Sequence, residues 1–263
     1  MKLSVIVTTY NRPRALEQVL CALGHQTHSV DEVIVADDGS DRATAHIIER
    51  ISSTSGFSPV HVWQPDRGFR AARIRNAAVR RSRGDYIVFL DGDCIPNRHF
   101  IADHLRLART GCFFQGKRVL VSKTVTNRFV WQHANAPGVL FKLMLSGELG
   151  NGHHLLRMAW LPAWMSPGLS GTRSCNIGVF RSDLYAVNGF NEAFEGWGRE
   201  DSELVARLYA YGLNRRVHAF LAICFHLWHD ENSRHRLAHN DALLRKVRSE
   251  NAYFTPEGLD RQS

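Results

Sequence analysis

Two carboxylates, Asp91 and Asp93, follow directly on a strongly apolar run, with only Gly92 between them. Residues 86–90 are aromatic, aliphatic or β-branched, which predicts a buried strand that fixes the backbone carrying the two acids. Two carboxylates at this spacing can share a hard divalent cation with substrate phosphates, because Mg²⁺ and Mn²⁺ prefer oxygen ligands. The alternative is a solvated turn, in which Asp and Gly are common.

The stretch "VIVADDGSD" gives a second acidic strand end. Asp37 or Asp38 could accept hydrogen bonds from a nucleobase N–H or from ribose hydroxyls, as acids do in other nucleotide sites. The alternative is an Asx turn closed by Gly39 and Ser40, and both descriptions can hold together.

Two histidines, His226 and His229, stand just past another strand-like run, "FLAICF". A lone histidine is usually structural, but a pair after a buried strand is a better metal candidate, because neutral imidazole binds Mn²⁺ or Zn²⁺. The spacing alone is not a zinc signature. One of the two histidines is a candidate to complete a site begun by Asp93.

The stretch "GWGREDSELVARLYAYG" predicts a helix from Ser202 onward that ends near Gly212. Its apolar stripe consists of Leu204, Val205, Leu208 and Tyr211. Asp201 projects onto this stripe and Glu200 lies at its edge, so Asp201 is either a helix cap or an aimed functional group. Glu203 and Arg207 lie off the stripe, which predicts an exposed i,i+4 ion pair.

Trp197 stands between two glycines just before this helix. Its flat apolar face is a frequent platform for a sugar ring, and the alternative is core packing.

The first half of the chain alternates strand-like and helix-like segments, which predicts βαβ units and a parallel sheet. Expected strands lie in residues 2–10, 31–41 (the last of these being acidic and turn residues), 58–64 and 85–90, with helices over residues 13–26, 43–52 and 69–82. Ligands of such sheets bind beyond the carboxyl ends of the strands. Thr8, Tyr10 and the acidic pairs fall at those ends, so we expect them to face one cleft.

The second half is less regular. Residues 124–167 carry Trp131, Trp160 and Trp164 among other apolar and cationic residues, which predicts a cover over the sheet. This cover either packs as a helical layer or lies on a membrane surface, where aromatic and cationic residues mix. Residues 234–248 have a polar, basic helical pattern. We expect one domain over residues 1–263, with a nucleotide-binding half of about residues 1–121 and an acceptor-binding half of about residues 122–263.

The composition is that of a globular protein, with 44% hydrophobic and 22% charged residues among 263. Five dispersed cysteines predict reduced thiols, and no apolar run reaches the ~18 residues of a membrane span. We therefore expect a cytoplasmic protein, with contact at the inner face of the cell membrane left open. The net charge of +8 and an arginine cluster in residues 67–83 favour an anionic partner.

Five stretches taken together resemble a known family. They are "SVIVTTYNR", "EVIVADDGSD", "GFRAARIRNAAVRRSRGDYIVFLDGDCIP", "SCNIGVFRSDLYAVNGFNEAFEGWGREDSEL" and "FHLWH". In this order they are similar to family 2 glycosyltransferases of the GT-A fold, near bacterial chondroitin-type polymerases and β-1,4-galactosyltransferase-like C-terminal domains. The resemblance implies an α/β, Rossmann-like, mostly parallel sheet flanked by helices, with a helical cover in the second half.

The resemblance also implies roles for the matching residues. Nucleotide-sugar contacts are implied for Thr8, Tyr10, Arg12, Asp37, Asp38, Arg70, Asn76, Asp91 and Asn176. A metal, Mn²⁺ or Mg²⁺, is implied at Asp93 and His226, with Asp91 and His229 in reserve. Trp197, Glu200 and Asp201 match the acceptor loop, with Asp201 as general base. One departure from the pattern is that Cys175-Asn176 is followed by Ile177-Gly178, where many members have a bulkier apolar residue.

The implied reaction is a metal-dependent, inverting transfer of a sugar from a nucleotide sugar, in particular a UDP-sugar. The acceptor would be a surface glycan or a lipid-linked saccharide. A sugar-phosphate nucleotidyltransferase is an alternative, but residues 8–11 lack the Gly-rich basic loop it would need. A nucleic-acid-binding module is a further alternative, for which the sequence lacks known patterns, so we expect no nucleic-acid partner.

Overall fold

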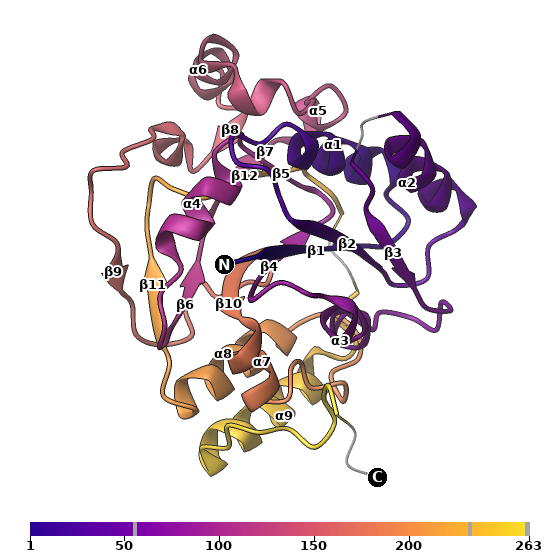
Figure 1. Cartoon of the computed structure of the whole chain (residues 1–263), viewed down its shortest axis with the longest axis vertical. Coiled ribbons are helices and arrows are strands. Elements are labelled where there is room, and N and C mark those ends of the chain that lie inside the picture. The colour runs from indigo at the N-terminus through magenta and orange to yellow at the C-terminus, as the bar shows by residue number, and fades with distance from the viewer. Residues whose placement is uncertain (55–56, 231–232, 261–263) are drawn as a thin grey trace.

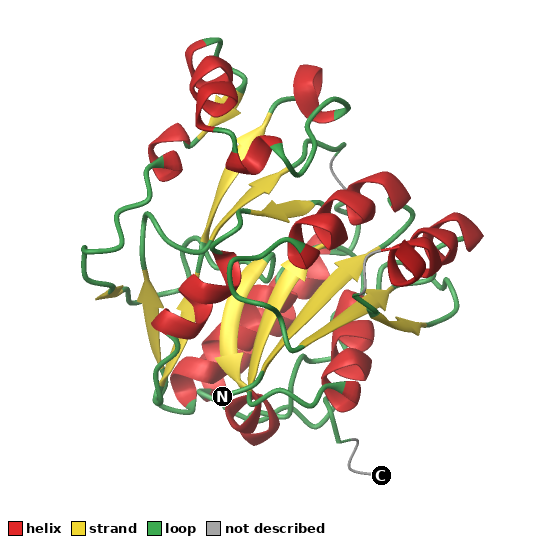
Figure 2. Ribbon diagram, turned by 45° about the horizontal axis from the view of Figure 1, so that its top comes forward, coloured by secondary structure: helices red, strands yellow, loops and turns green. Residues whose placement is uncertain are grey.

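The computed structural model describes residues 1–54, 57–230 and 233–260. Its centre is a sheet of eight strands in the order β3-β2-β1-β4-β10-β6-β11-β9, flanked by helices on both faces (Figures 1 and 2). The sheet is mixed, because β10 runs antiparallel to both β4 and β6. This architecture confirms the predicted α/β class.

The N-terminal part is a succession of parallel βαβ units. Its strands are β1 (Leu3–Thr9), β2 (Glu32–Asp37), β3 (Val60–Trp63) and β4 (Tyr86–Asp91), and its helices are α1 (Pro13–Gly24), α2 (Arg42–Thr54) and α3 (Ala71–Arg81). Helices α1 and α2 lie on one side of these strands and α3 on the other (Figure 1). The alternating side chains of β1 explain both layers, since Val5 and Val7 join the core under α1 while Ile6 joins the core under α3.

The rest of the large sheet comes from later segments. The strands are β6 (Cys112–Gln115), β9 (Trp164–Met165), β10 (Asn176–Phe180) and β11 (Asn214–Val217), and the helices are α4 (Phe100–Leu107), α7 (Arg181–Ala186), α8 (Glu200–Ala210) and α9 (Leu237–Glu250). Helix α8 ends one residue before Tyr211, and Gly212 follows with φ +101°, as the predicted helix end requires. Its start precedes the predicted Ser202 by two residues.

A second sheet of four strands lies beside the ends of the first. It consists of β5 (Cys94–Pro96), β12 (Ile223–His226), β7 (Lys117–Val121) and β8 (Leu149–Gly150), in that order. The cover expected over residues 124–167 therefore contributes strands as well as helices. Its helical parts are α5 (Lys123–Thr126), η1 (His133–Asn135), α6 (Pro137–Leu145) and η2 (Gly152–Leu155). The division of the chain near residue 121 stays a prediction.

One feature of α8 contradicts the sequence prediction. Glu203 and Arg207 do form an i,i+4 ion pair, at 2.7 Å, but both side chains are fully buried. Arg207 also donates hydrogen bonds to the carbonyl oxygens of Val187 and Gly189, at 2.6 and 2.7 Å. The expectation of a surface pair is wrong because α7 and the turn after it cover this face of the helix.

Gly178, which belongs to the stretch that departs from the family pattern, faces the ring of Tyr86. A Cβ atom at position 178 would lie 2.2 Å from the Tyr86 hydroxyl, which is far inside van der Waals contact. The two residues meet because β10 and β4 are neighbours, with Val179 opposite Ile87. The tyrosine ring thus occupies the space that a larger side chain at position 178 would fill.

Within the described residues, no helix has both the length and the apolar character needed to cross a bilayer.

Candidate active site

A cleft of about 860 Å³ opens at the carboxyl ends of β1 and β4 and is closed on the far side by the start of α8. Eleven of the residues singled out in the sequence line this cleft. They are Thr8, Tyr10, Arg12, Asp38, Asp91, Asp93, Trp197, Glu200, Asp201, His226 and His229. Residues from five distant parts of the chain therefore meet in one place, as the strand-end argument predicted.

The two predicted acids of the β4 end take different directions. Gly92 between them donates a backbone hydrogen bond to the Thr8 carbonyl oxygen at 2.7 Å, and a Cβ atom there would meet that oxygen at 3.0 Å. The glycine lets the chain turn tightly against β1. As a consequence Asp91 points towards α3 and Asp93 points towards β12.

Asp93 and the two histidines form a compact group of potential ligands. The Nε2 atom of His226 lies 3.8 Å from Oδ1 of Asp93, and Nε2 of His229 lies 3.4 Å from Oδ2. One ligand atom from each residue lies within 4.8 Å of the other two. Burial lowers the pKa of His226 to about 4, so its ring is neutral at pH 7 and can donate a lone pair to a cation.

These three side chains fit a divalent ion, since one carboxylate and two imidazoles suit Mn²⁺. The Nη1 atom of Arg12 lies 3.0 Å from Oδ2 of Asp93, so a positive charge already stands beside this carboxylate. Asp91 belongs to a different group, and His229 rather than Asp91 stands beside Asp93 and His226.

A buried arginine, Arg75 on α3, lies at the centre of the other acids. Its guanidinium group is 3.4 Å from Asp91, 3.6 Å from Glu200 and 3.5 Å from Asp201. Its Nε atom donates a hydrogen bond to the Thr8 hydroxyl at 3.1 Å. One cation thus faces three carboxylates, and this positions Asp201 relative to the end of β4.

The shared arginine does not neutralise all three acids. Burial raises the pKa of Asp91 to about 7, although Arg75 acts in the opposite direction. Burial, together with the neighbouring Asp201, raises the pKa of Glu200 to about 7. Asp201 is the more accessible of the two acids of α8 that line the cleft, with its side chain 24% exposed against 9% for Glu200. Asp201 therefore presents the carboxylate that is open to the cleft.

The loop before α8 has an unusual backbone that aims these acids. Gly196, Gly198 and Arg199 all have positive φ, at 72°, 105° and 79°. The loop is tied to the rest of the site by a hydrogen bond from the Gly196 amide to the Phe69 carbonyl oxygen, at 2.9 Å. Trp197 lies between the two glycines, and the Arg234 guanidinium lies 5.4 Å from its ring centre.

The two acids at the end of β2, Asp37 and Asp38, have different surroundings. Asp38 lines the cleft and accepts hydrogen bonds from the Arg70 amide at 2.7 Å and from Gln64 at 2.5 Å. Burial raises its pKa. Asp37 instead accepts from the Ser40 amide at 2.8 Å and contacts His61 at 2.9 Å, away from the cleft lining. The Asx-turn description is therefore correct for Asp37.

Three further residues predicted to contact the nucleotide do not line the cleft. The Asn76 amide exchanges hydrogen bonds with the backbone of Phe190, at 2.8 and 2.9 Å. Asn176 is buried against His104 and the Ala222 carbonyl oxygen. The Arg70 guanidinium group donates to the Pro65 carbonyl oxygen at 2.5 Å. The polar groups of Asp37, Asn76, Asn176 and Arg70 hold turns and strands together, and their contact with the nucleotide stays a prediction.

Sequence reasoning missed Arg75, although a signal was present. Arg75 lies three or four residues from Ala71, Ala72, Ala78 and Val79, all of them buried on the same face of α3. An arginine on the apolar face of a helix needs a buried partner, which was the available signal. Arg118 and Arg173 also line the cleft outside the quoted stretches, and Trp228 lines it from within "FHLWH", where no role was assigned to it.

Comparison with known proteins extends these observations. A family model described as "Glycosyl transferase family 2" matches residues 4–160, and one described as "N-terminal domain of galactosyltransferase" matches residues 164–230. Validoxylamine A glucosyltransferase of Streptomyces hygroscopicus subsp. jinggangensis is 28% identical over 235 residues, covering 82% of this chain and 53% of that protein. Chondroitin synthase of Escherichia coli is 27% identical over 231 residues, covering 80% of this chain and 32% of that protein. The chain thus spans about half the length of the glucosyltransferase and about a third of the length of the chondroitin synthase.

Two solved structures share the fold. Residues 1–349 of S. aureus TarS, in complex with UDP-GlcNAc, superpose with a TM-score of 0.65 at 17% identity, covering 97% of this chain and 68% of that one. The mannosyltransferase PcManGT from Pyrobaculum calidifontis, in complex with GDP-Man and Mn²⁺, gives 0.57 at 17% identity, covering 95% and 71%. At these identities the likeness establishes the architecture only.

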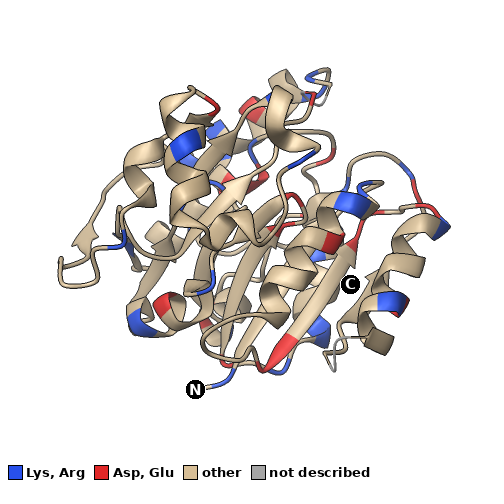
Figure 3. Ribbon diagram, turned by 90° about the horizontal axis from the view of Figure 1, so that it is seen from above, with Lys and Arg blue, Asp and Glu red and all other residues tan. Residues whose placement is uncertain are grey.

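The mixed sheet with a polar cleft at its strand ends is the GT-A fold, and the match to the family model makes the protein a glycosyltransferase. The chain belongs to glycosyl transferase family 2. This membership sets aside the nucleotidyltransferase and nucleic-acid-binding alternatives. In agreement, Lys and Arg are spread around the outline of the molecule rather than gathered in one stripe (Figure 3).

Proposed function

We propose that this enzyme transfers a sugar from a UDP-sugar to a hydroxyl group of a saccharide or lipid-linked acceptor, with inversion at the anomeric carbon. The observation that carries the proposal is the meeting of Asp201 with the Asp93, His226 and His229 group in one cleft. The UDP-GlcNAc complex of TarS and the names of the glucosyltransferase and chondroitin synthase relatives support a nucleotide-sugar donor.

In this proposal the donor lies across the ends of β1, β2 and β4. Asp38 is buried at the base of the cleft, where it accepts hydrogen bonds from uracil or ribose. Thr8, Tyr10 and Arg12 come from the end of β1 and the loop after it, and Arg12 supplies a positive charge for the diphosphate. Each of these residues would contact a different portion of the nucleotide.

Asp93, His226 and His229 would hold a divalent cation, Mn²⁺ or Mg²⁺. The bound ion would neutralise negative charge on the diphosphate leaving group. The PcManGT complex with Mn²⁺ supports a cation on this fold.

Asp201 would act as general base. The acceptor oxygen forms a bond to the anomeric carbon while the bond from that carbon to the diphosphate oxygen breaks, and the acceptor proton goes to the Asp201 carboxylate. Such a base typically contributes about 10²–10⁴-fold to the rate. Arg75 holds Asp201 from behind at 3.5 Å, and Glu200 is buried beside it, so Asp201 is the carboxylate that reaches the acceptor.

The test combines donor binding and transfer. Thermal shift with UDP and several UDP-sugars, with and without Mn²⁺, identifies the donor for the wild type. Asp93→Ala should lose the Mn²⁺-dependent part of the shift. Asp201→Asn should retain the shift and lose transfer by about 10²–10⁴-fold. Glu49→Gln, which changes an exposed carboxylate on α2, is the matched control and should change neither.

Two outcomes would contradict the proposal. Undiminished transfer by Asp201→Asn removes it from the role of base. A shift that is the same for Asp93→Ala and wild type, with and without Mn²⁺, removes the cation from the site.

A further inference from the structure

An apolar surface lies on the cover, outside the cleft. Nine of the sixteen large apolar side chains exposed in the described residues fall within residues 139–165, which we call the 139–165 surface. They are Val139, Phe141, Met144, Leu145, Leu156, Trp160, Leu161, Trp164 and Met165. Single exposed apolar residues are ordinary, but this concentration in one-tenth of the chain indicates an interaction surface.

Helix α6 forms the most prominent part of this surface and projects from the top of the molecule in Figures 1 and 2. Its sequence, PGVLFKLML, has Lys142 as its one charged residue, yet only Leu140 is buried. Phe141 is 58% and Leu145 71% exposed. A helix with so many apolar side chains is normally covered, by protein or by lipid.

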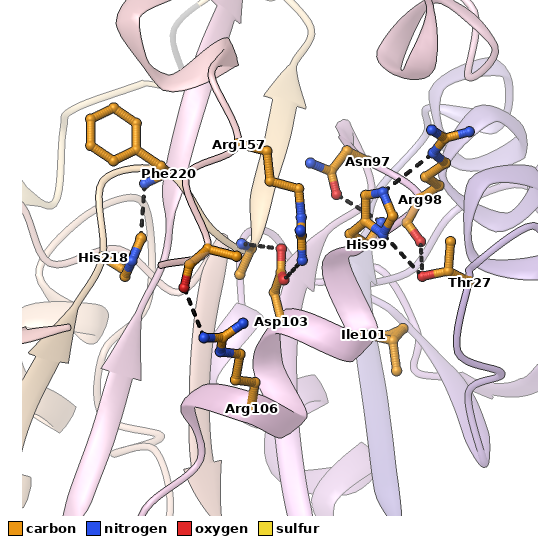
Figure 4. A network of polar contacts seen from close by, with 12 residues as sticks. Thr27, Asn97, Arg98, His99, Ile101, Asp103, Arg106, Arg157, His218 and Phe220 are labelled. Atoms are coloured by element: carbon orange, nitrogen blue, oxygen red, sulfur yellow. Dashed lines mark hydrogen bonds and ion pairs between the residues drawn. The ribbon is translucent and has the colours of Figure 1, made fainter. Parts of the chain in front are cut away.

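The rest of the surface is held on a fixed backbone. Arg157 forms an ion pair with Asp103 of α4 at 2.5 Å, and Arg106 donates to the Ala159 carbonyl oxygen at 2.8 Å (Figure 4). His218 contacts the Leu161 carbonyl oxygen at 3.0 Å. Trp160 lies between these anchored positions and is 74% exposed. Its exposure therefore follows from the anchored backbone on both sides of it.

The charges around the surface are mostly positive. Residues 122–165 contain four cationic side chains, Lys123, Arg128, Lys142 and Arg157, of which Arg157 is paired with Asp103, and one acidic side chain, Glu148. The Glu148 carboxylate accepts hydrogen bonds from the hydroxyl groups of Ser122 and Thr124, so it is already bound to neighbouring side chains of the protein. Aromatic and aliphatic side chains with surrounding cations match the interface of an anionic bilayer.

We propose that the 139–165 surface docks on an anionic lipid bilayer, with α6 and Trp160 inserted at the level of the headgroups. Nine residues of helix are about 14 Å long, too short to cross a hydrocarbon core of about 30 Å, so the contact is interfacial. The Lys123 ammonium lies 4.4 Å from the ring centre of Trp228, a residue of the cleft lining. Val121 of β7 lines the cleft and pairs with Leu149 of β8, so residues 139–165 adjoin the cleft and docking would bring a membrane-held acceptor near it. Docking itself does not depend on the proposed reaction.

The test is co-sedimentation of the full chain with lipid vesicles. The wild type should bind vesicles of mixed phosphatidylcholine and phosphatidylglycerol. It should bind only weakly to vesicles that contain phosphatidylcholine as their single lipid. Raising NaCl from about 0.1 M to about 0.5 M should weaken binding, because the electrostatic part is screened. The double variant Phe141→Asp/Leu145→Asp should lower the partition coefficient at least tenfold, which corresponds to about 1.4 kcal/mol.

Two further variants make the result specific. Trp160→Ser changes the anchored part of the surface and should also reduce binding, so it decides the matter if the double variant does not fold. Tyr253→Asp removes an aromatic side chain of similar exposure (49%) near the C-terminus and should leave binding unchanged. Circular dichroism melts establish that each variant is folded.

Three results would overturn the proposal. One is failure of the wild type to bind anionic vesicles. The second is equal loss of binding in Tyr253→Asp. The third is self-association of the wild type in light scattering that the Phe141→Asp/Leu145→Asp variant abolishes without any lipid binding, which would make the surface an interface between two copies of the chain.

Discussion

Helix α8 buries charge in two ways within two turns. In its second turn, Glu203 and Arg207 satisfy one another at 2.7 and 2.8 Å, and two backbone carbonyl oxygens accept the remaining arginine N–H groups. In its first turn, Glu200 and Asp201 share Arg75 with Asp91, and the contacts are 3.4–3.6 Å long. The first arrangement is complete and the second is short of positive charge. The difference teaches that a buried charge with all its partners supports the fold, whereas one with too few is available for a ligand.

The largest effect should come from breaking the complete pair. Arg207→Met leaves Glu203 buried without its partner, so we expect the free energy of unfolding to fall by about 3–5 kcal/mol in urea denaturation followed by circular dichroism. Arg50→Met is the matched control, because Arg50 pairs with Glu17 at 2.5 Å but is 53% exposed. It should cost less than about 1 kcal/mol. Equal losses in the two variants would show that the burial of the pair is irrelevant.

Removing the shared cation of the cleft should have a smaller effect that depends on pH. In Arg75→Met the three carboxylates lose their partner. The pKa values of Asp91 and Glu200 rise further, because Arg75 lowers both, so these two acids remain protonated in the folded state over a wider range. We expect a loss of about 2–4 kcal/mol at pH 8 and a clearly smaller loss at pH 5, where protonation relieves the repulsion. Arg73→Met, an exposed arginine on the same helix, is the control. A loss independent of pH would contradict the description of the site as short of positive charge.

The smallest effect has the opposite sign. Because the pKa of Glu200 is raised from 4.5 to about 7, the folded protein retains a proton that the unfolded chain releases between these two pH values. Unfolding free energy therefore falls as pH rises through this range and stays lower above pH 7. Glu200→Gln removes this penalty and should stabilise the metal-free protein by about 1–2 kcal/mol at pH 8, with no gain at pH 4. Thermal unfolding of the variant and the wild type in the presence of a chelator measures this difference in stability. Destabilisation of Glu200→Gln at pH 8 would show that the contact with Arg75 outweighs the cost of burying Glu200.

The order of strands and helices in the N-terminal half could be predicted because each element there carries its own periodic pattern. Residues 85–90 were expected as a strand and form β4, and the acids after them reach the cleft because strand ends gather at one edge of the sheet. Asp38, Asp93 and Asp201 were expected to meet, and all three line one cleft.

What the sequence could not supply was the partner of each polar group. Asn76 and Asn176 matched family positions, but an amide can equally well join two backbone segments, and Phe190 and Ala222 are too distant in sequence to be foreseen. Arg207 was placed on the surface because helix periodicity describes one apolar stripe and takes no account of a second element covering the opposite face. The roles of the cleft residues themselves stay predictions until the variants above are measured.

The close approach of Gly178 to Tyr86 has a consequence for the enzymes that share this fold. Since one ring fills the volume that two ordinary side chains would divide, positions 86 and 178 form a single steric unit although 91 residues separate them. A relative with a larger residue at the second position should carry something smaller than tyrosine at the first, and Gly178→Val should be tolerated here only together with a change such as Tyr86→Ala.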